Sequence, residues 1–312
     1  MNYHSDKWVM DKIETHLEAT NVRGENWVSL MAYGSQNYGL DTQSSDVDTR
    51  LIVLPSFEDI VLNKKPVSYT KILPNDEHID FKDIRLFIDC LKKQNMAYLE
   101  CIFTPYKMAS SVYWNEWQAL LNEREAIARY NTYKAVKTMK GIAMEKYHAM
   151  EHRYPTKVRL IDTYGYDSKQ LMHLLRIEQY LGRYIDGVKY ADCLQAPMGD
   201  YLLDVKNYHY NLEAARIVAN TAINNITRVA DDYCSKTKDE GNEELAQAFV
   251  SDFAGNTQSY DSPDAYYLAL TDPNAELKTK DMLTSVTEVF MNTYGNGDRW
   301  EEFAVGALTG II

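Results

Sequence analysis

Two aspartates separated by one residue, Asp46 and Asp48, are the side chains in this sequence whose type and spacing best fit catalysis. In an extended strand, residues two apart lie on the same face, so the two carboxylates would lie side by side. Carboxylates that close repel each other unless a cation lies between them. Magnesium binds one or two carboxylates together with phosphate oxygens and water. The pair therefore predicts a site for Mg²⁺ or Mn²⁺.

A Gly-Ser pair lies upstream of these aspartates, at the end of an apolar run. Gly34 has no side chain, which allows a phosphate to approach the backbone closely. Ser35 would open a helical turn, where free N–H groups and the helix dipole favour an anion, and its hydroxyl can donate a further hydrogen bond. The pair predicts a phosphate-binding turn beside the metal site, although Gly-Ser also occurs in turns that only connect strands.

A third acidic ligand is expected on a neighbouring strand. Residues 78–82 alternate between polar and apolar, which places Asp80 on the polar face. Asp76 and Glu77 follow Pro74-Asn75 and are expected in a turn, whereas Asp83 is better placed as a helix cap. Asp80 is therefore the predicted third catalytic acid. It would bind metal and help to remove a proton from an attacking hydroxyl, in a site that holds two ions about 3.5–4 Å apart.

A second group of polar residues lies far along the chain. Lys169, His173 and Arg176 are spaced to fall on one stripe of a helix that Asp167 would cap. Cations stacked in this way weaken a helix slightly unless an anion lies against them. One interpretation is that they bind the β- and γ-phosphates of a nucleotide opposite Ser35, and the other is a solvated helix face. The apolar side should be buried, and consists of Leu171, Leu174 and Leu175.

The elements that must position these residues change in type along the chain. Ser5 is expected to cap a first helix, and strands are predicted at 27–33, 50–54 and 78–82, with a loop or a short strand between the last two. The periodicity then predicts helices at 84–91, 123–151, 168–183 and 212–235. The expected fold class is α+β, a small mixed sheet followed by an α-helical domain. The predicted domains are a catalytic domain at 1–122, a helical domain at 123–235 that completes the nucleotide site, and a helical extension at 236–312.

Composition narrows the class of protein. The chain of 312 residues is 45% apolar and 25% charged, as is typical of soluble proteins, and no apolar run approaches the roughly 18 residues of a membrane helix. Its four scattered cysteines fit reduced thiols in the cytoplasm. The net charge is −12, yet residues 129–189 contain 12 lysines and arginines against 6 acidic residues. This basic segment suits a triphosphate or an RNA end, or is simply a solvated helix surface.

The catalytic pattern resembles a known signature. Gly34-Ser35, Gly39 and Ser45-Asp46-Val47-Asp48 are spaced as in nucleotidyltransferases of the DNA polymerase beta superfamily. The resemblance implies a mixed-sheet catalytic domain, magnesium-bound aspartates and nucleotide-binding roles for Gly34, Ser35 and Ser45. Two later segments, Lys92–Glu100 and Tyr166–Arg176, resemble motifs of a bacterial and phage subgroup, some of whose members are found beside RNA ligases. There the resemblance implies phosphate binding by Lys169, His173 and Arg176. Met96 and Ser168 depart from those motifs.

Together these patterns predict an enzyme that transfers a nucleoside monophosphate from a triphosphate such as ATP to a hydroxyl and releases pyrophosphate. An RNA or tRNA 3′ end is the first expectation for the acceptor, as in RNA repair. A protein side chain, as for adenylylating toxins or regulators, is the second, and a small molecule is the third. A nucleotide-binding module without catalysis is a separate alternative, although such a module would not need both Asp46 and Asp48.

Overall fold

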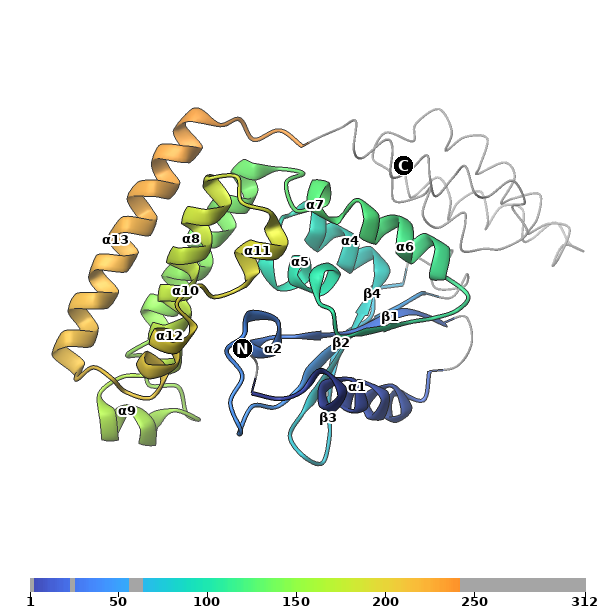
Figure 1. Ribbon diagram of the computed structural model, residues 1–312, viewed down its shortest axis with the longest axis horizontal. Helices are drawn as coiled ribbons and strands as arrows, with labels where there is room; N and C mark the ends of the chain where they lie inside the picture. Colours follow the sequence, from blue (N-terminus) through green and yellow to red (C-terminus); the bar gives the residue numbers. More distant parts are fainter. Residues whose placement is uncertain (1–2, 23–25, 56–63, 242–312) are drawn as a thin grey trace, which may run out of the picture.

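A five-stranded mixed sheet lies between α1 (Asp6–Thr20) on one side and α4 (Ile84–Lys92), α5 (Met96–Phe103) and α6 (Trp114–Asn122) on the other (Figure 1). The computed structural model describes residues 3–22, 26–55 and 64–241. The strand order is β3-β4-β2-β1-β5, with β2 and β4 parallel and the other neighbours antiparallel. The strands are β1 (Trp27–Tyr33), β2 (Asp48–Val53), β3 (Ser68–Ile72), β4 (His78–Asp83) and β5 (Lys107–Ala109). The three predicted strands are confirmed, β3 is the short strand allowed between them, and β5 was not predicted.

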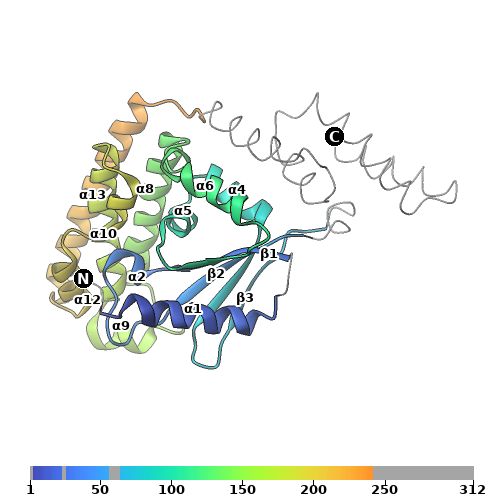
Figure 2. The ribbon, with the colours of Figure 1, turned by 45° about the vertical axis from the view of Figure 1, so that its right-hand side comes forward.

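The two faces of the sheet bury separate apolar cores. One face packs against α1, with Leu30, Leu51 and Ile79 pointing toward it. The other packs against α4, α5 and α6 (Figure 2). Ser5 caps α1 by accepting from the Trp8 amide at 3.2 Å, as predicted. Alternation along each strand therefore assigns every residue to one of two different environments.

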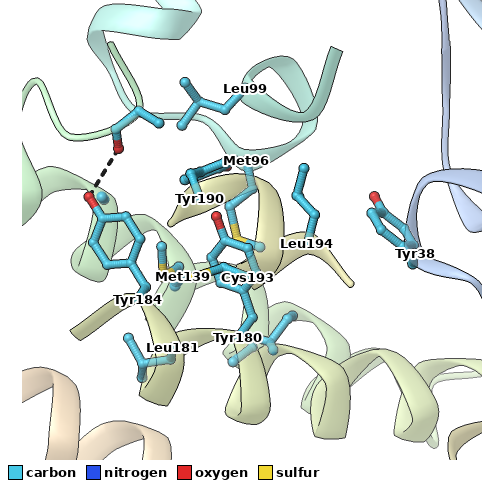
Figure 3. Close-up of a cluster of buried hydrophobic side chains, with 14 of the residues drawn as sticks. Tyr38, Met96, Leu99, Met139, Tyr180, Leu181, Tyr184, Tyr190, Cys193 and Leu194 are labelled. Atoms are coloured by element: carbon cyan, nitrogen blue, oxygen red, sulfur yellow. Dashed lines mark hydrogen bonds between the residues drawn. The ribbon is translucent and has the colours of Figure 1, made fainter. Parts of the chain in front are cut away.

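A second group of helices stands beside the sheet. It consists of α7 (Arg124–Ile127), α8 (Thr132–Ala149), α9 (Val158–Tyr164), α10 (Ser168–Ile185), α11 (Tyr190–Leu194), α12 (Gly199–Lys206) and α13 (Leu212–Lys236). The helix α10 is buried between α8 and α13, and its expected apolar residues are inside (Leu171, Leu174 and Leu175). Aromatic side chains of α10 and α11 fill the space up to α5 (Figure 3). The α+β fold is thus confirmed, and a single apolar core joins residues on both sides of the expected boundary at 122.

One predicted helix was wrong. The periodicity at 123–151 indicated a continuous helix, but the chain breaks at 128–131 into α7 and α8. Asn131 has an extended backbone and its side chain accepts from the Lys134 amide at 2.8 Å, so it acts as the N-cap of α8. The capping preference of asparagine explains the interruption. The predicted extension at 236–312 lies almost entirely outside the described residues.

Cys90, Cys101, Cys193 and Cys234 are all free thiols. Across the described ranges, no helix combines the length and apolar character needed to cross a membrane.

Candidate active site

The predicted acids of β2 and β4 lie on the same face of the sheet. The register pairs Arg50 with Asp80, so residues two positions away from Arg50, including Asp48, point the same way as Asp80. Tyr33 pairs with Asp48 on the next strand. Burial raises the pKa of Tyr33, and the charges of Asp48 and Asp80 raise it further. Both carboxylates therefore act on a single phenol, and they face the helical layer.

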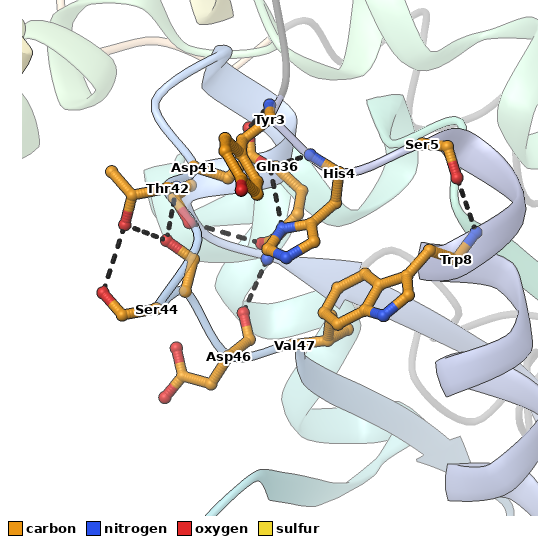
Figure 4. Close-up of polar contacts among 12 residues, drawn as sticks. Tyr3, His4, Ser5, Trp8, Gln36, Asp41, Thr42, Ser44, Asp46 and Val47 are labelled. Atoms are coloured by element: carbon orange, nitrogen blue, oxygen red, sulfur yellow. Dashed lines mark hydrogen bonds and ion pairs between the residues drawn. The ribbon is translucent and has the colours of Figure 1, made fainter.

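Asp46 is the most accessible of the three acids. Its side chain is exposed and points away from its loop, toward open solvent (Figure 4). The backbone beneath it is held, because its carbonyl accepts from Gln36 Nε2 at 2.6 Å. The next residue, Val47, donates its amide to Glu77 Oε1 at 3.3 Å. The loop is thus fixed while its carboxylate stays free to bind a ligand.

Asp48 lies in an environment that disfavours its charge. Burial raises its pKa, and the nearby negative charge of Asp46 raises it further. The backbone N–H of His78, which donates to Asp48 Oδ1 at 2.9 Å, offsets part of this effect, as do the His78 ring and Lys169. Asp46 and Asp48 therefore repel each other, and a divalent cation bound between them would stabilise both charges.

Asp80 is bound more tightly within the protein. Its Oδ2 lies 3.3 Å from Arg50 Nη2, and its Oδ1 accepts from Thr70 Oγ1 at 2.5 Å. Arg50 is itself buried between the rings of Tyr33 and Tyr98, at 4.7 and 4.0 Å from their centroids. Both oxygens of Asp80 therefore have partners. Among the described residues, no group of three His, Cys, Asp or Glu side chains is positioned to hold a metal ion.

The Gly34-Ser35 turn opens a short helix, as the sequence predicted. Gly34 has φ 103° and ψ −147°, a conformation that L side chains rarely adopt, and a Cβ at this position would meet no atom within 4 Å. Ser35 is half-buried and begins the short helix α2 (Ser35–Tyr38). The Gly34 amide donates to Glu100 Oε1 at 2.8 Å, and the phenol of Tyr38 donates to the other oxygen of Glu100. A buried carboxylate therefore fixes the turn from beneath.

Ser45 is engaged in its own turn. Its hydroxyl accepts from the Thr42 amide at 2.8 Å, and its amide donates to the Thr42 carbonyl at 2.9 Å. These bonds shape the loop that presents Asp46. In the structure Ser45 thus positions an acid, and its expected contact with the nucleotide stays a prediction.

The residues of the predicted α10 stripe lie at different depths. Lys169 is exposed at the start of the helix, where Asp167 caps α10 by accepting from its amide at 3.0 Å. Its positive charge lowers the pKa of Asp48, so the two side chains lie within electrostatic range of each other. His173 lies one turn further in. Its pKa is lowered well below the ordinary value, mainly by burial and then by the charges of Arg176 and Lys169. An imidazole in this environment is neutral at pH 7.

Arg176 does not reach the surface of the site. It is 9% exposed, and its guanidinium lies 3.8 Å from the centre of the Tyr38 ring. The charge of Glu100 acts on it favourably. A direct contact with a phosphate at the surface, as the helical spacing suggested, does not match this burial. Two α-helical turns carry Arg176 from the solvent edge into the core beneath Tyr38, within electrostatic range of Glu100.

Two lysines that the sequence did not single out belong to the same cluster. The pKa of Lys206, at the end of α12, is lowered by burial and by Lys169, and Asp46 and Asp41 offset this effect. Lys146 of α8 contributes to the low pKa of His173. A lone lysine in a separate helix carries no local signal, so only the fold could bring these residues together. Glu100 did carry a signal, since it is the one acid in the apolar run of α5.

The site thus consists of acids from the sheet opposite cations from the helices. Such an arrangement can hold a polyanion between lysines while the acids bind a cation beside it. This arrangement is the one expected from the resemblance to nucleotidyltransferases of the DNA polymerase beta superfamily.

Comparison with known proteins identifies the group more narrowly. The model of the RNA repair pathway DNA polymerase beta family (RlaP) matches residues 8–183, and the chain belongs to this family. That range includes the aspartates, the phosphate turn and most of α10, whereas Lys206 lies beyond it. No curated protein matches the sequence.

Among solved structures, the chain is similar to the crystal structure of a nucleotidyltransferase-like protein from Exiguobacterium sibiricum 255-15. The two share 10% sequence identity, the match covers 93% of this chain and 92% of the other, and the TM-score is 0.27.

Proposed function

We propose that this nucleotidyltransferase transfers a nucleoside monophosphate from a nucleoside triphosphate to the 3′-terminal hydroxyl of an RNA, with release of pyrophosphate. The observation that carries the proposal is the opposition of Asp46 and Asp48 to Lys169 and Lys206. Lys169 acts on the pKa of Asp48, and Asp46 acts on the pKa of Lys206, so each lysine lies within electrostatic range of one acid. The family description supports an RNA acceptor.

The donor set suits a divalent cation at Asp46 and Asp48. These two carboxylates are like-charged neighbours, and oxygen ligands are those that magnesium prefers. Bound there, the cation would neutralise phosphate charge and activate the attacking oxygen. Asp80 would complete the expected two-ion site only by exchanging its contact with Thr70 or Arg50. We therefore assign the first two acids as the primary ligands and Asp80 as the third.

The remaining residues bind and orient the triphosphate. Lys169 and Lys206 would bind the β- and γ-phosphates that leave as pyrophosphate, and His173 supplies a neutral ring beside them. The open backbone at Gly34 admits a phosphate that no Cβ obstructs, and the Ser35 hydroxyl can donate to it. In this arrangement the acceptor oxygen attacks the α-phosphorus in line with the departing pyrophosphate. Positioning and charge neutralisation supply most of the rate enhancement in such transfers.

A labelling experiment tests the reaction and its acceptor together. The protein is incubated with each α-³²P-labelled NTP, magnesium and total cellular extract, and the product is treated with RNase or protease. We expect a label that RNase removes. A label that only protease removes would replace RNA by a protein acceptor, and a label resistant to both would point to a small molecule.

The variant Asp46→Asn/Asp48→Asn should abolish labelling and pyrophosphate release. Asp89→Asn is the matched control, because Asp89 is an exposed acid of α4 that pairs with Lys93 away from the site. Labelling that persists in the double variant would refute the assignment of the acids. Triphosphate binding without pyrophosphate release, across all extracts, would favour a non-catalytic module.

A further inference from the structure

The segment that contains α9 combines basic and aromatic residues next to the lysine cluster. Residues 153–164 include three lysines or arginines and one acid. They also include two tyrosines with large exposed areas, Tyr154 at 46% and Tyr164 at 51%. Alternating cations and rings are typical of surfaces that bind single-stranded nucleic acid.

Tyr164 is held in a fixed orientation. Its ring stacks on that of Tyr208, with centroids 3.9 Å apart and planes 18° apart. The next residue, Gly165, ends α9 with φ 83°, and the side chain of Leu212 packs so closely that a Cβ on Gly165 would lie 2.8 Å from it. One face of the Tyr164 ring is thus covered by Tyr208 while much of the residue is exposed. A preordered ring loses little entropy when a base stacks on it.

This surface is joined directly to the proposed phosphate site. Lys157, just before α9, forms an ion pair with Asp167 at 3.4 Å, and Asp167 caps the helix that begins with Ser168 and Lys169. The Ser168 hydroxyl donates to the Lys206 carbonyl at 2.5 Å. Tyr208 follows Lys206 by two residues. The stacked tyrosines therefore share their backbone anchors with the two lysines that face Asp46 and Asp48.

The segment has a small net positive charge, because two of its three cations are already in ion pairs. Arg153 pairs with Asp162 at 2.7 Å, and Lys157 is used by Asp167. Arg159 is exposed on α9, and its backbone carbonyl accepts from Thr163. Its side chain forms no ion pair with the described residues, so its charge is available to a phosphate. One cation and one ring are appropriate for a short contact with a strand end rather than for binding a long duplex.

We infer that Tyr164, stacked on Tyr208, is the platform on which an unpaired base of a single-stranded RNA acceptor stacks, with Arg159 binding its backbone. The inference rests on the proposed function, because it assigns a binding surface to the acceptor of that reaction. The strand end would then extend from the platform past Lys206 toward the acids.

The test measures RNA binding alone, without NTP or added metal, by fluorescence anisotropy with a labelled single-stranded RNA 10-mer. We expect Tyr164→Ala to weaken binding about 10-fold. Tyr164→Phe should bind as the wild type does, because it keeps the ring. Tyr69→Ala is the matched control, since Tyr69 is equally exposed, at 52%, but lies on β3 at the far edge of the sheet. Arg159→Gln should reduce the slope of log K against log salt by about 0.7.

Unfolding temperatures of all variants verify that each is folded. Equal binding by wild type and Tyr164→Ala, an equal loss in Tyr69→Ala, or no binding of RNA by the wild type would each overturn the platform. Pyrophosphate release is measured separately with the extract used for labelling. If Tyr164→Ala still releases pyrophosphate and binds RNA as the wild type does, the platform is refuted and the nucleotidyl transfer is not. If the wild type binds RNA but releases no pyrophosphate in any condition, only the proposed reaction is refuted.

Discussion

Two carboxylates that are neighbours in the fold, Glu77 and Asp48, have opposite electrostatic environments. Glu77 lies on the α1 side and accepts from His16 Nε2 at 3.1 Å and from Lys12 and Asn75. Burial alone would raise its pKa, but these donors lower it below the ordinary value. Asp48 has a raised pKa, from burial and from Asp46. The protein compensates the charge of Glu77 with several of its own groups and that of Asp48 only in part, through His78 and Lys169.

The two carboxylates make opposite contributions to the stability of the fold. Glu77 stabilises the loop that carries the acids, since one of its oxygens accepts from the Val47 amide. Asp48 lowers stability in the absence of a cation, because its charge is partly desolvated beside a like charge. Variants at the two positions should therefore change stability in opposite directions.

The largest expected effect is that of Asp48→Asn on catalysis. The amide keeps an acceptor for the His78 amide but loses the charge that binds the cation. Pyrophosphate release should fall at least about 100-fold. In chelator-treated protein, the same variant should raise the unfolding temperature by about 2 °C, since it removes an unfavourable charge. Magnesium should raise the unfolding temperature of the wild type and not of the variant. A lower unfolding temperature for Asp48→Asn than for the wild type would contradict the inference that the charge of Asp48 destabilises the metal-free protein.

The second effect concerns Glu77→Gln, which should lower the free energy of unfolding by about 2 kcal/mol at pH 7 in urea titrations. The folded-state pKa of Glu77 is depressed, so its stabilisation is present above the unfolded value of 4.5 and is lost as pH falls through the folded value. The gap between wild type and variant should therefore narrow below pH 4.5. A gap that is constant from pH 7 to pH 3 would show that the charge of Glu77 is not what stabilises the loop.

A smaller effect is expected for Lys206→Ala. It should weaken magnesium-ATP binding about fivefold in isothermal titration, because the removed cation faces Asp46 and would bind a phosphate. Lys134→Ala is a suitable control, since Lys134 lies near the start of α8 and its amino group is 3.7 Å from Asp239. Equal affinities in the two variants would remove Lys206 from the phosphate site.

The smallest effect concerns Glu100. Burial raises its pKa to about 7, although the Arg176 charge and the Gly34 amide oppose this. Ionisation of Glu100 in the folded state is therefore disfavoured between its unfolded value of 4.5 and about 7, and stability falls with rising pH across that window. Glu100→Gln should show a shallower decline of unfolding temperature between pH 5 and pH 7. Superimposable profiles would show that the carboxyl does not titrate in that range.

Local patterns predicted those parts of the molecule that depend on neighbours in sequence. The alternation at 78–82 placed Asp80 on the face of Asp48, and Asp83 caps α4 as expected. The same reasoning missed the break before α8, where one asparagine cap interrupts a helical pattern.

Contacts between distant residues could not be predicted in this way. Arg176 lay on the expected stripe, but whether that part of the stripe faces solvent or Tyr38 depends on how deeply α10 is buried. Lys206 approaches Lys169 only because α12 ends against the start of α10. For the described residues, the sequence therefore predicted the shared face of Asp48 and Asp80 and the turn at Gly34-Ser35. The approach of Lys206 to Lys169 and the burial of Arg176 required the three-dimensional structure.

The burial of Arg176 has a consequence for synthesis on the ribosome. Glu100 fixes the Gly34 turn, yet the Arg176 charge that favours its ionised form is absent until α10 has emerged and packed. The amino-terminal half of a nascent chain thus carries the Gly34-Ser35 turn without the charge of Arg176 beneath it. Domains generally fold as units. Stalled chains that end before residue 167 should not retain labelled ATP, so the emerging enzyme would capture its substrate only when α10 is in place.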